Sequence, residues 1–311
     1  DKEINGHEIS AILGFSAEKW DTEYESLAAA GYQSDLLQTI SAGDPTTIQG
    51  QSYDYAQRLI SYVSRVNYAY KDKYLASFSF RRDGYSAFGP NTKYGDFPAA
   101  SVGWNVAKED FLAGNNVISN LKLRFSYGVS GNPFFDTGNV LVDNFPFLSL
   151  LGSQTAIVDG GSAAAFNPIN IANTDLQWES SVEINPGIDF GFFSNRITGS
   201  IEYYERTSEK LLIDNPVSST TGFSSALVNL GKVKNSGLEF EIRTKNVTSE
   251  NFSWNSTLLL SANDNELVSF GASDGQIQNI DAKRAAEWVN SVGNPISSFY
   301  GWVVDRDIPL E

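Results

Sequence analysis

The chain has 311 residues, and 22 Lys and Arg against 37 Asp and Glu give it a net charge of −15. The absence of Cys excludes disulfides, thiol catalysis and thiolate metal sites, and a single His argues against a zinc site or a catalytic triad built on histidine. The acidic balance argues against nucleic acid as a partner, because duplex binding needs a basic face.

In the first half of the chain, apolar and polar residues alternate with the two-residue period of β-strands. No segment approaches the roughly 18 consecutive apolar residues that a transmembrane helix needs. Residues 21–40 depart from the alternation, because their apolar residues fall roughly on one stripe and predict a helix inside a loop. The predicted strands of this half are 7–16, 60–70, 74–81, 98–106 and 121–129.

The second half repeats the alternation. Its predicted strands are 182–190, 196–203, 238–243 and 253–262. Pro186 lies inside the first of them and should cause a bulge or a missing ladder hydrogen bond. The sequence therefore predicts an all-β chain with about nine strands.

Long and short connections alternate between these strands. The long ones are 19–57, 85–95, 131–175, 208–227 and 265–311, and the clearest short ones are 71–73, 192–195 and 247–251. This order places every long loop at one end of the sheet, and Tyr and Phe residues flank two of the short turns, as in the aromatic girdle of a membrane barrel. An antiparallel transmembrane β-barrel is therefore favoured, and a soluble β-sandwich stays open as the alternative.

Several sequence blocks carry a resemblance to a known family. RVNYAYKDKYL, RRDGYSAFGPN and FPAASVGW, followed by KEDF, lie within 58–111, and later blocks include NLKLRFSYGVSGN at 120–132, NLGKVKNSGLEFEI at 229–242 and NPISSFYGW at 294–302. Segment 173–212 also fits, although INPGIDF departs from the usual unbroken strand. As an ordered set, the blocks closely resemble the barrel of SusC/RagA-type TonB-dependent outer-membrane transporters of Bacteroidota.

The resemblance implies that residues 1–311 are an internal portion of one TonB-dependent receptor β-barrel domain of about 22 strands, without its plug, its TonB box and its terminal strand. It implies TonB-dependent import of an oligosaccharide or peptide together with a SusD-like surface lipoprotein, in an outer membrane of lipid and lipopolysaccharide. The short turns would then be periplasmic and the long loops extracellular. The alternatives are a passive porin, a structural barrel subunit of an envelope complex, and a soluble β-sandwich that binds carbohydrate.

No residue set supports catalysis, so we expect no enzymatic activity, metal site or cofactor. Aromatic loop residues are the expected substrate contacts, because rings stack on sugar faces or bind apolar peptide side chains; packing of the loops or contact with a lid protein is the alternative. These candidates are Trp20, Tyr53, Phe134, Phe135, Trp178 and Trp288. Basic residues on the polar faces are the candidates to line the lumen and bind a plug. They are Arg65, Arg81, Lys122, Arg124 and Arg243. For Arg81, which ends a strand at the rim, a salt bridge within a turn is the expectation and substrate contact is the alternative.

Overall fold

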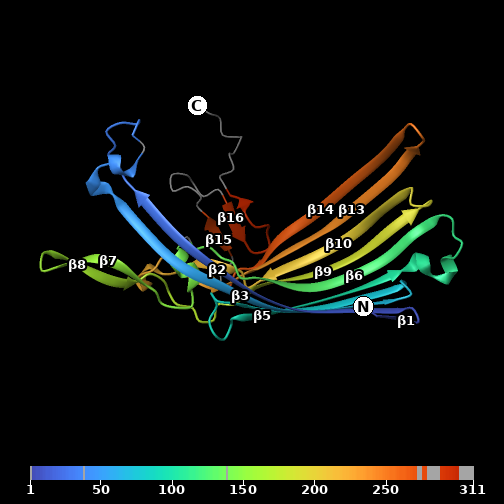
Figure 1. Cartoon of the computed structure of the whole chain (residues 1–311), viewed down its shortest axis with the longest axis horizontal. Helices are drawn as coiled ribbons and strands as arrows, with labels where there is room; N and C mark the ends of the chain where they lie inside the picture. Colours follow the sequence, from blue (N-terminus) through green and yellow to red (C-terminus); the bar gives the residue numbers. More distant parts are fainter. Residues whose placement is uncertain (1, 38, 138, 272–274, 279–287, 301–311) are drawn as a thin grey trace, which may run out of the picture.

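One large antiparallel sheet dominates the protein. The computed structural model describes residues 2–37, 39–137, 139–271, 275–278 and 288–300. Within them, ten strands pair in the order β1-β2-β3-β4-β5-β6-β9-β10-β13-β14, and Figure 1 shows them as a curved, open wall. Their bounds are β1 Lys2–Ile4, β2 His7–Ala28, β3 Gln49–Tyr70, β4 Tyr74–Tyr85, β5 Tyr94–Asn105, β6 Ile118–Asn132, β9 Glu179–Phe192, β10 Ile197–Glu209, β13 Lys232–Thr248 and β14 Ser253–Ser269.

The nine predicted strands are confirmed, because each lies, to within one residue at its ends, inside one of the nine long strands. Pairing aligns their apolar residues in rows that cross the wall. One such row runs through Tyr74, Trp104, Leu123, Ile188, Ile201, Phe240 and Leu260. Ile201 is 44% exposed and Leu260 57% exposed, whereas a β-sandwich would bury such residues against a second sheet. The soluble sandwich is therefore wrong, and the apolar face is the one that a barrel turns to lipid.

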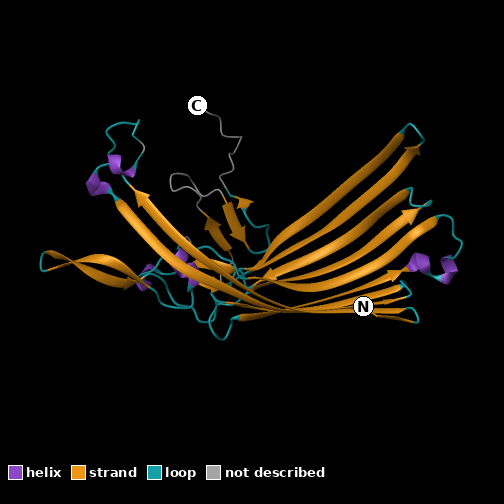
Figure 2. Cartoon of the chain, viewed as in Figure 1, coloured by secondary structure: helices purple, strands orange, loops and turns teal. Residues whose placement is uncertain are grey.

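Connections of different length lie at the two ends of the wall (Figure 2). The short-turn end carries 71–73, 106–117, 193–196 and 249–252, of which 106–117 is the longest and contains η3 Val106–Lys108 and η4 Asp110–Leu112. The loop end carries 29–48, 86–93, 133–178 and 210–231, and all of these except 86–93 are longer than any connection at the short-turn end. They hold the helices α1 Val140–Asn144, η1 Ile40–Ala42, η2 Pro45–Thr47 and η5 Ser219–Thr221, and the hairpins β7 Leu151–Val158 with β8 Gly161–Pro168 and β11 Leu212–Pro216 with β12 Ser225–Asn229.

Three short strands follow β14 and form a separate sheet. They are β15 Gly275–Gln278, β16 Trp288–Ser291 and β17 Ser298–Phe299. They occupy part of the predicted loop 265–311, the remainder of which lies partly outside the described residues. Across the part of the chain that the structure places, no helix is long and apolar enough to cross a membrane.

The helix predicted over 21–40 is wrong. Strand β2 continues to Ala28, and every residue from His7 onward pairs with a residue of β3, ending at Ala28 opposite Gln49. Pairing supplies the backbone hydrogen bonds that a helix would otherwise supply, and the ring of Tyr24 stacks on that of Tyr53 with centroids 4.7 Å apart. The loop expected over 19–57 is accordingly reduced to 29–48.

Pro186 has the expected effect on its strand. Against β6 the pairing continues through Phe125 opposite Pro186. Against β10 it is interrupted between Gly187, which pairs with Glu202, and Ile184, which pairs with Glu205. The missing ladder contacts follow from the absence of an N–H on proline, so this prediction is confirmed.

Candidate functional site

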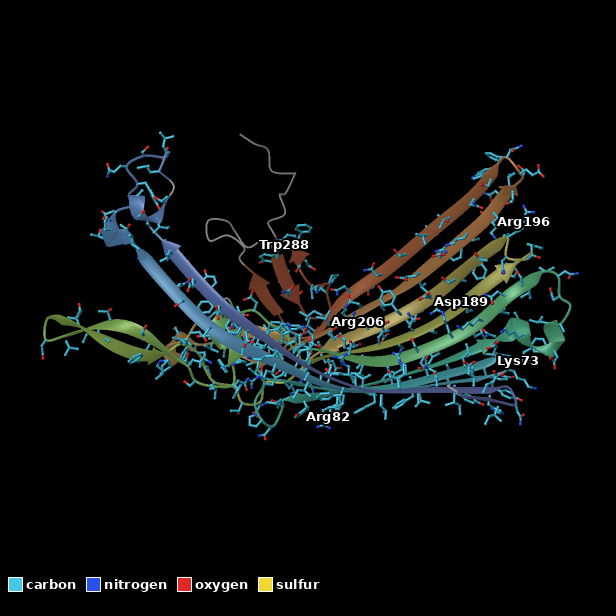
Figure 3. The ribbon with its side chains drawn as sticks, in the orientation of Figure 1. Lys73, Arg82, Asp189, Arg196, Arg206 and Trp288 are labelled. Carbon is cyan, nitrogen blue, oxygen red and sulfur yellow. The ribbon has the colours of Figure 1, made fainter. Side chains whose placement is uncertain are left out.

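The polar face of the wall carries an ion-pair network centred on Arg124. Its Nε donates to Oδ1 of Asp189 at 3.2 Å, its Nη1 donates to the side chain of Asn185 at 3.2 Å, and its Nη2 donates to Oε1 of Glu202. The Arg124, Asp189 and Glu202 side chains are all less than one-third exposed. Figure 3 shows Asp189 part way along β9, between the two ends of the wall. The network therefore ties β6, β9 and β10 together.

Gly187 is what allows Arg124 to reach across β9. Gly187 pairs with Arg124 of β6 on one side and with Glu202 of β10 on the other. A Cβ at Gly187 would lie 2.7 Å from Cζ of Arg124 and 2.9 Å from its Nη1. The guanidinium thus occupies the space that any other residue would fill.

We expect Gly187→Ala to displace Arg124 and to destabilise the full-length barrel by about 1–2 kcal/mol, because Glu202 loses a charged hydrogen-bond donor. The measurement is the temperature at which the receptor in detergent loses its folded mobility on a gel. Gly128→Ala is the matched control, because a Cβ there would meet Ala99 at an ordinary 3.5 Å. Equal shifts for the two variants would contradict the role of Gly187.

Hollows lie along the same polar face, over strands β3 to β6. One has a volume of about 460 Å³, and its polar lining includes Asn67, Ser77, Lys122 and Arg124. Asn67 links two neighbouring strands within it, because it accepts from Ser77 at 2.8 Å and donates to Ser10 at 3.1 Å. Small side chains thus leave a recess that a second surface can enter.

The five basic residues singled out from the sequence all lie on this polar face. Arg81 binds Asp83 at 2.6 Å and donates to Ser61 at 3.1 Å, and Arg243 binds Glu241 at 2.5 Å. Within the described ranges, Arg65 and Lys122 have no ion-pair partner. Arg206 also lies on the polar face. The sequence analysis did not single it out, although it continues the alternation of Thr198, Ser200 and Glu202.

The aromatic candidates separate into distinct groups. Trp178 and Phe135 belong to a hydrophobic core at the base of the long loops, together with Tyr85, Phe88 and Phe97. Trp178 is 6% exposed, and its Nε1 donates to the carbonyl of Lys93 at 3.0 Å, so its geometry is that of a packing anchor.

Helix α1 in the same loop carries Asp143. Burial raises the pKa of Asp143, although hydrogen bonds from Thr137 act in the opposite direction.

The other four aromatic candidates are more accessible. Trp20 and Tyr53 lie on the paired strands β2 and β3 and not in a loop. Phe134 is 61% exposed and meets Tyr85 edge-on. Trp288 on β16 packs on Phe299 with ring centroids 4.4 Å apart. Tyr24 and Tyr55, which the sequence analysis did not single out, lie beside Tyr53.

A second polar cluster stands at the short-turn end. Glu109 accepts hydrogen bonds from Oη of Tyr74 at 2.7 Å and from Nε1 of Trp104 at 2.9 Å, and Lys73 contacts it at 3.2 Å. The bonds from Tyr74 and Trp104, together with Lys73, hold the pKa of Glu109 below its usual value. Hydrogen bonds to Asp110 and Glu109 raise the pKa of Lys73. The cluster fixes two rings of the apolar face to the turn 106–117.

We expect Glu109→Gln to lower the unfolding temperature of the full-length receptor at neutral pH and to leave it unchanged in acid. A lowered folded-state pKa stabilises above the unfolded value of about 4.3, and this stabilisation is lost as the pH falls through the folded value. The measurement is the unfolding temperature of both proteins from pH 7 to pH 3. Asp72→Asn removes the exposed pair with Lys108 and should change little. A difference that persists unchanged at pH 3 would contradict the assignment.

No group of three or more His, Cys, Asp or Glu side chains that could hold a metal occurs among the residues that the structure describes.

Comparisons with known proteins agree with this geometry. A family model described as TonB dependent receptor-like, beta-barrel matches residues 5–303. TonB-dependent receptor P3 of Formosa agariphila is 35% identical over 312 residues, which cover 97% of this chain and 30% of that receptor. TonB-dependent receptor SusC of Bacteroides thetaiotaomicron is 31% identical over 259 residues, which cover 79% of this chain and 25% of that receptor.

The fold also matches a solved structure, that of the RagAB peptide transporter, with a TM-score of 0.81 at 23% identity. The match covers 95% of this chain and 31% of that one. The chain thus spans less than a third of the length of these relatives.

Proposed function

Because the chain belongs to the family of TonB-dependent receptor-like β-barrels and is part of an outer-membrane barrel, we propose that it forms wall and loops of an active nutrient importer. The observation that carries the proposal is the two-faced wall, with an exposed apolar row on one side and the Arg124 network on the other. A barrel turns these faces to lipid and to a wet lumen. The whole importer would be driven by TonB.

The long loops are proposed to be extracellular and the short turns periplasmic. Aromatic rings of the apolar face gather beside the short turns, where Tyr70 and Tyr74 stack with centroids 6.4 Å apart and Phe190 lies 5.6 Å from Phe192. Rings of this kind favour the membrane interface. The position of Trp104, bonded to Glu109 in the turn 106–117, supports the same orientation.

A plug domain is proposed to fill the lumen beside the polar face. Arg65, Lys122 and Arg206 point to this side without an ion-pair partner in the described part of the chain, and the recess beside Lys122 has room for a second surface. Charged side chains that face a barrel lumen need water or protein groups as partners. Arg124, by contrast, is already satisfied within the wall and is proposed to stiffen it.

A SusD-like surface lipoprotein is proposed to cover the long loops. The hairpin β7–β8 projects from the loop end (Figure 1) and carries exposed apolar side chains at Leu151, Ile157, Val158 and Phe166. Its strands have no charged residue, which suits a protein contact better than open water. The nutrient itself is proposed to be an oligosaccharide or a peptide.

The test is to purify the full-length receptor from its host in detergent and to measure nutrient uptake by cells with and without TonB. We expect a SusD-like lipoprotein to copurify and uptake to require TonB. A barrel recovered alone, whose transport is unaffected by loss of TonB, would instead indicate a passive porin or a structural barrel.

A further inference from the structure

Strands β2 and β3 extend together beyond β4 and form an arm. Strand β3 pairs with β4 only from Leu59 onward, whereas it pairs with β2 along its whole length. Residues 19–28 and 49–58 therefore project past the wall, at the loop end of Figure 1. The neighbouring β4 and β5 each have 12 residues, close to the 9–11 or so that cross a membrane, so the arm lies beyond the lipid.

The arm has two chemically different faces. Pairing continues without a register shift from Ser10 opposite Asn67 to Tyr24 opposite Tyr53, so the inner face of the arm continues the polar face of the wall. The outer face is charged, with Asp21, Glu23, Asp54 and Arg58 among its members. The nearest charge on the inner side is Glu18, which stands at the base of the arm opposite Leu59. The inner face of the arm itself consists mainly of rings, amides and hydroxyls: Trp20, Thr22, Tyr24, Tyr53, Tyr55 and Gln57.

Four rings form a strip along the inner face of the arm. Tyr24 and Tyr53 stack with planes 12° apart, and Tyr53 and Tyr55 follow with centroids 6.3 Å apart. Trp20 continues the row on β2, two places beyond Thr22, which pairs with Tyr55. Trp20 is 39% exposed and Tyr24 40% exposed, so ring surface remains free for a ligand. Neither lipid nor the hydrophobic core accounts for this strip.

We propose that the strip binds a neutral oligosaccharide at the entrance to the lumen. Flat rings match the C–H faces of sugars, while the amide of Gln57 and the hydroxyl of Thr22 match sugar hydroxyls. The nearly uncharged inner face suits an uncharged ligand, whereas a polyanionic glycan or charged peptide would need ionic partners here. The assignment names a substrate class and so rests on the proposed import function.

The test uses the full-length receptor in detergent, without its lipoprotein, on a glycan array that carries neutral and anionic oligosaccharides. We expect binding to neutral glycans only. Tyr53→Ala should weaken the affinity for the best neutral glycan about fivefold or more, because one ring of the stack is lost. Tyr53→Phe keeps the ring and should retain the affinity, and Asp54→Ala on the outer face is the matched control.

Absence of neutral-glycan binding, or equal losses for Tyr53→Ala and Asp54→Ala, would overturn the assignment. If Tyr53→Phe also lost binding, the hydroxyl of Tyr53 and not its ring would determine the affinity. That result would overturn the proposed stacking of the ring on the sugar. TonB-dependent uptake of another nutrient together with no glycan binding would reject this inference alone. Absence of any TonB-dependent uptake would reject the importer.

Discussion

Replacing Arg124 by Gln is expected to destabilise the full-length barrel by about 2–3 kcal/mol, the largest effect of a single polar substitution in this wall. The change leaves Asp189 and Glu202 without their shared cation. Glu239 stands directly opposite Glu202 on β13, so the uncompensated carboxylates also repel one another. Removing one partner of a partly buried network costs more than the network contributes, because the remaining charges stay poorly solvated.

The measurement is the unfolding temperature of Arg124→Gln and of the double variant with Glu202→Gln, which removes one of the carboxylates and should restore part of the loss. Arg243→Gln is the control, because the Arg243 side chain is 65% exposed and its pair with Glu241 should contribute little. If the Arg124→Gln and Arg243→Gln proteins unfolded at the same temperature, the network would not stabilise the wall.

Replacing Trp178 by Ala is expected to loosen the long loops while leaving the barrel folded. Trp178 packs against Phe97 at 5.4 Å and Phe88 at 5.7 Å between ring centroids, and its loss should cost about 3–5 kcal/mol of local packing. Because the core joins residues of several loops, segments 86–93 and 133–178 should become sensitive to protease. Docking of a surface lipoprotein should weaken with them.

The measurement is limited proteolysis of the detergent-solubilised receptor, followed by identification of the cleavage sites. Phe134→Ala is the control, because that ring is largely exposed and should leave the digestion pattern unchanged. An unaltered pattern in Trp178→Ala would show that the loops are held by other contacts.

Much of the wall could be predicted from the sequence, because alternation is a local property that sheet pairing preserves. Pro186 illustrates this, since a missing N–H has the same effect in any paired strand. Residues 21–40 illustrate the limit. A stripe of apolar residues fits a helix, but residues 21–28 pair one by one with β3. That pairing depends on partners that lie 21 (Ala28 with Gln49) to 35 (Asp21 with Ala56) residues further along the chain.

The candidate sites depended more strongly on register. The sequence placed Arg124 on the polar face, but only the pairing of β6, β9 and β10 brings it over Gly187 to Glu202. The aromatic residues were selected because they lie in predicted loops. Whether each ring is buried could not be predicted from its neighbours in the sequence. Trp178 closes a core made by distant segments, whereas Trp20 and Tyr53 lie on the same face of an open arm.

The membrane-crossing wall with its long loops outside is tested most directly by labelling, on intact cells, single cysteines introduced into these 311 residues, which contain no Cys. The receptor that lacks the introduced cysteine gives the background labelling. Ser162→Cys would place a thiol near the tip of the hairpin β7–β8, and Asn116→Cys would place one in the short-end turn. A maleimide that cannot cross the outer membrane should label position 162 on intact cells and position 116 only after that membrane is opened. Labelling of both positions on intact cells, or of position 116 alone, would contradict this orientation.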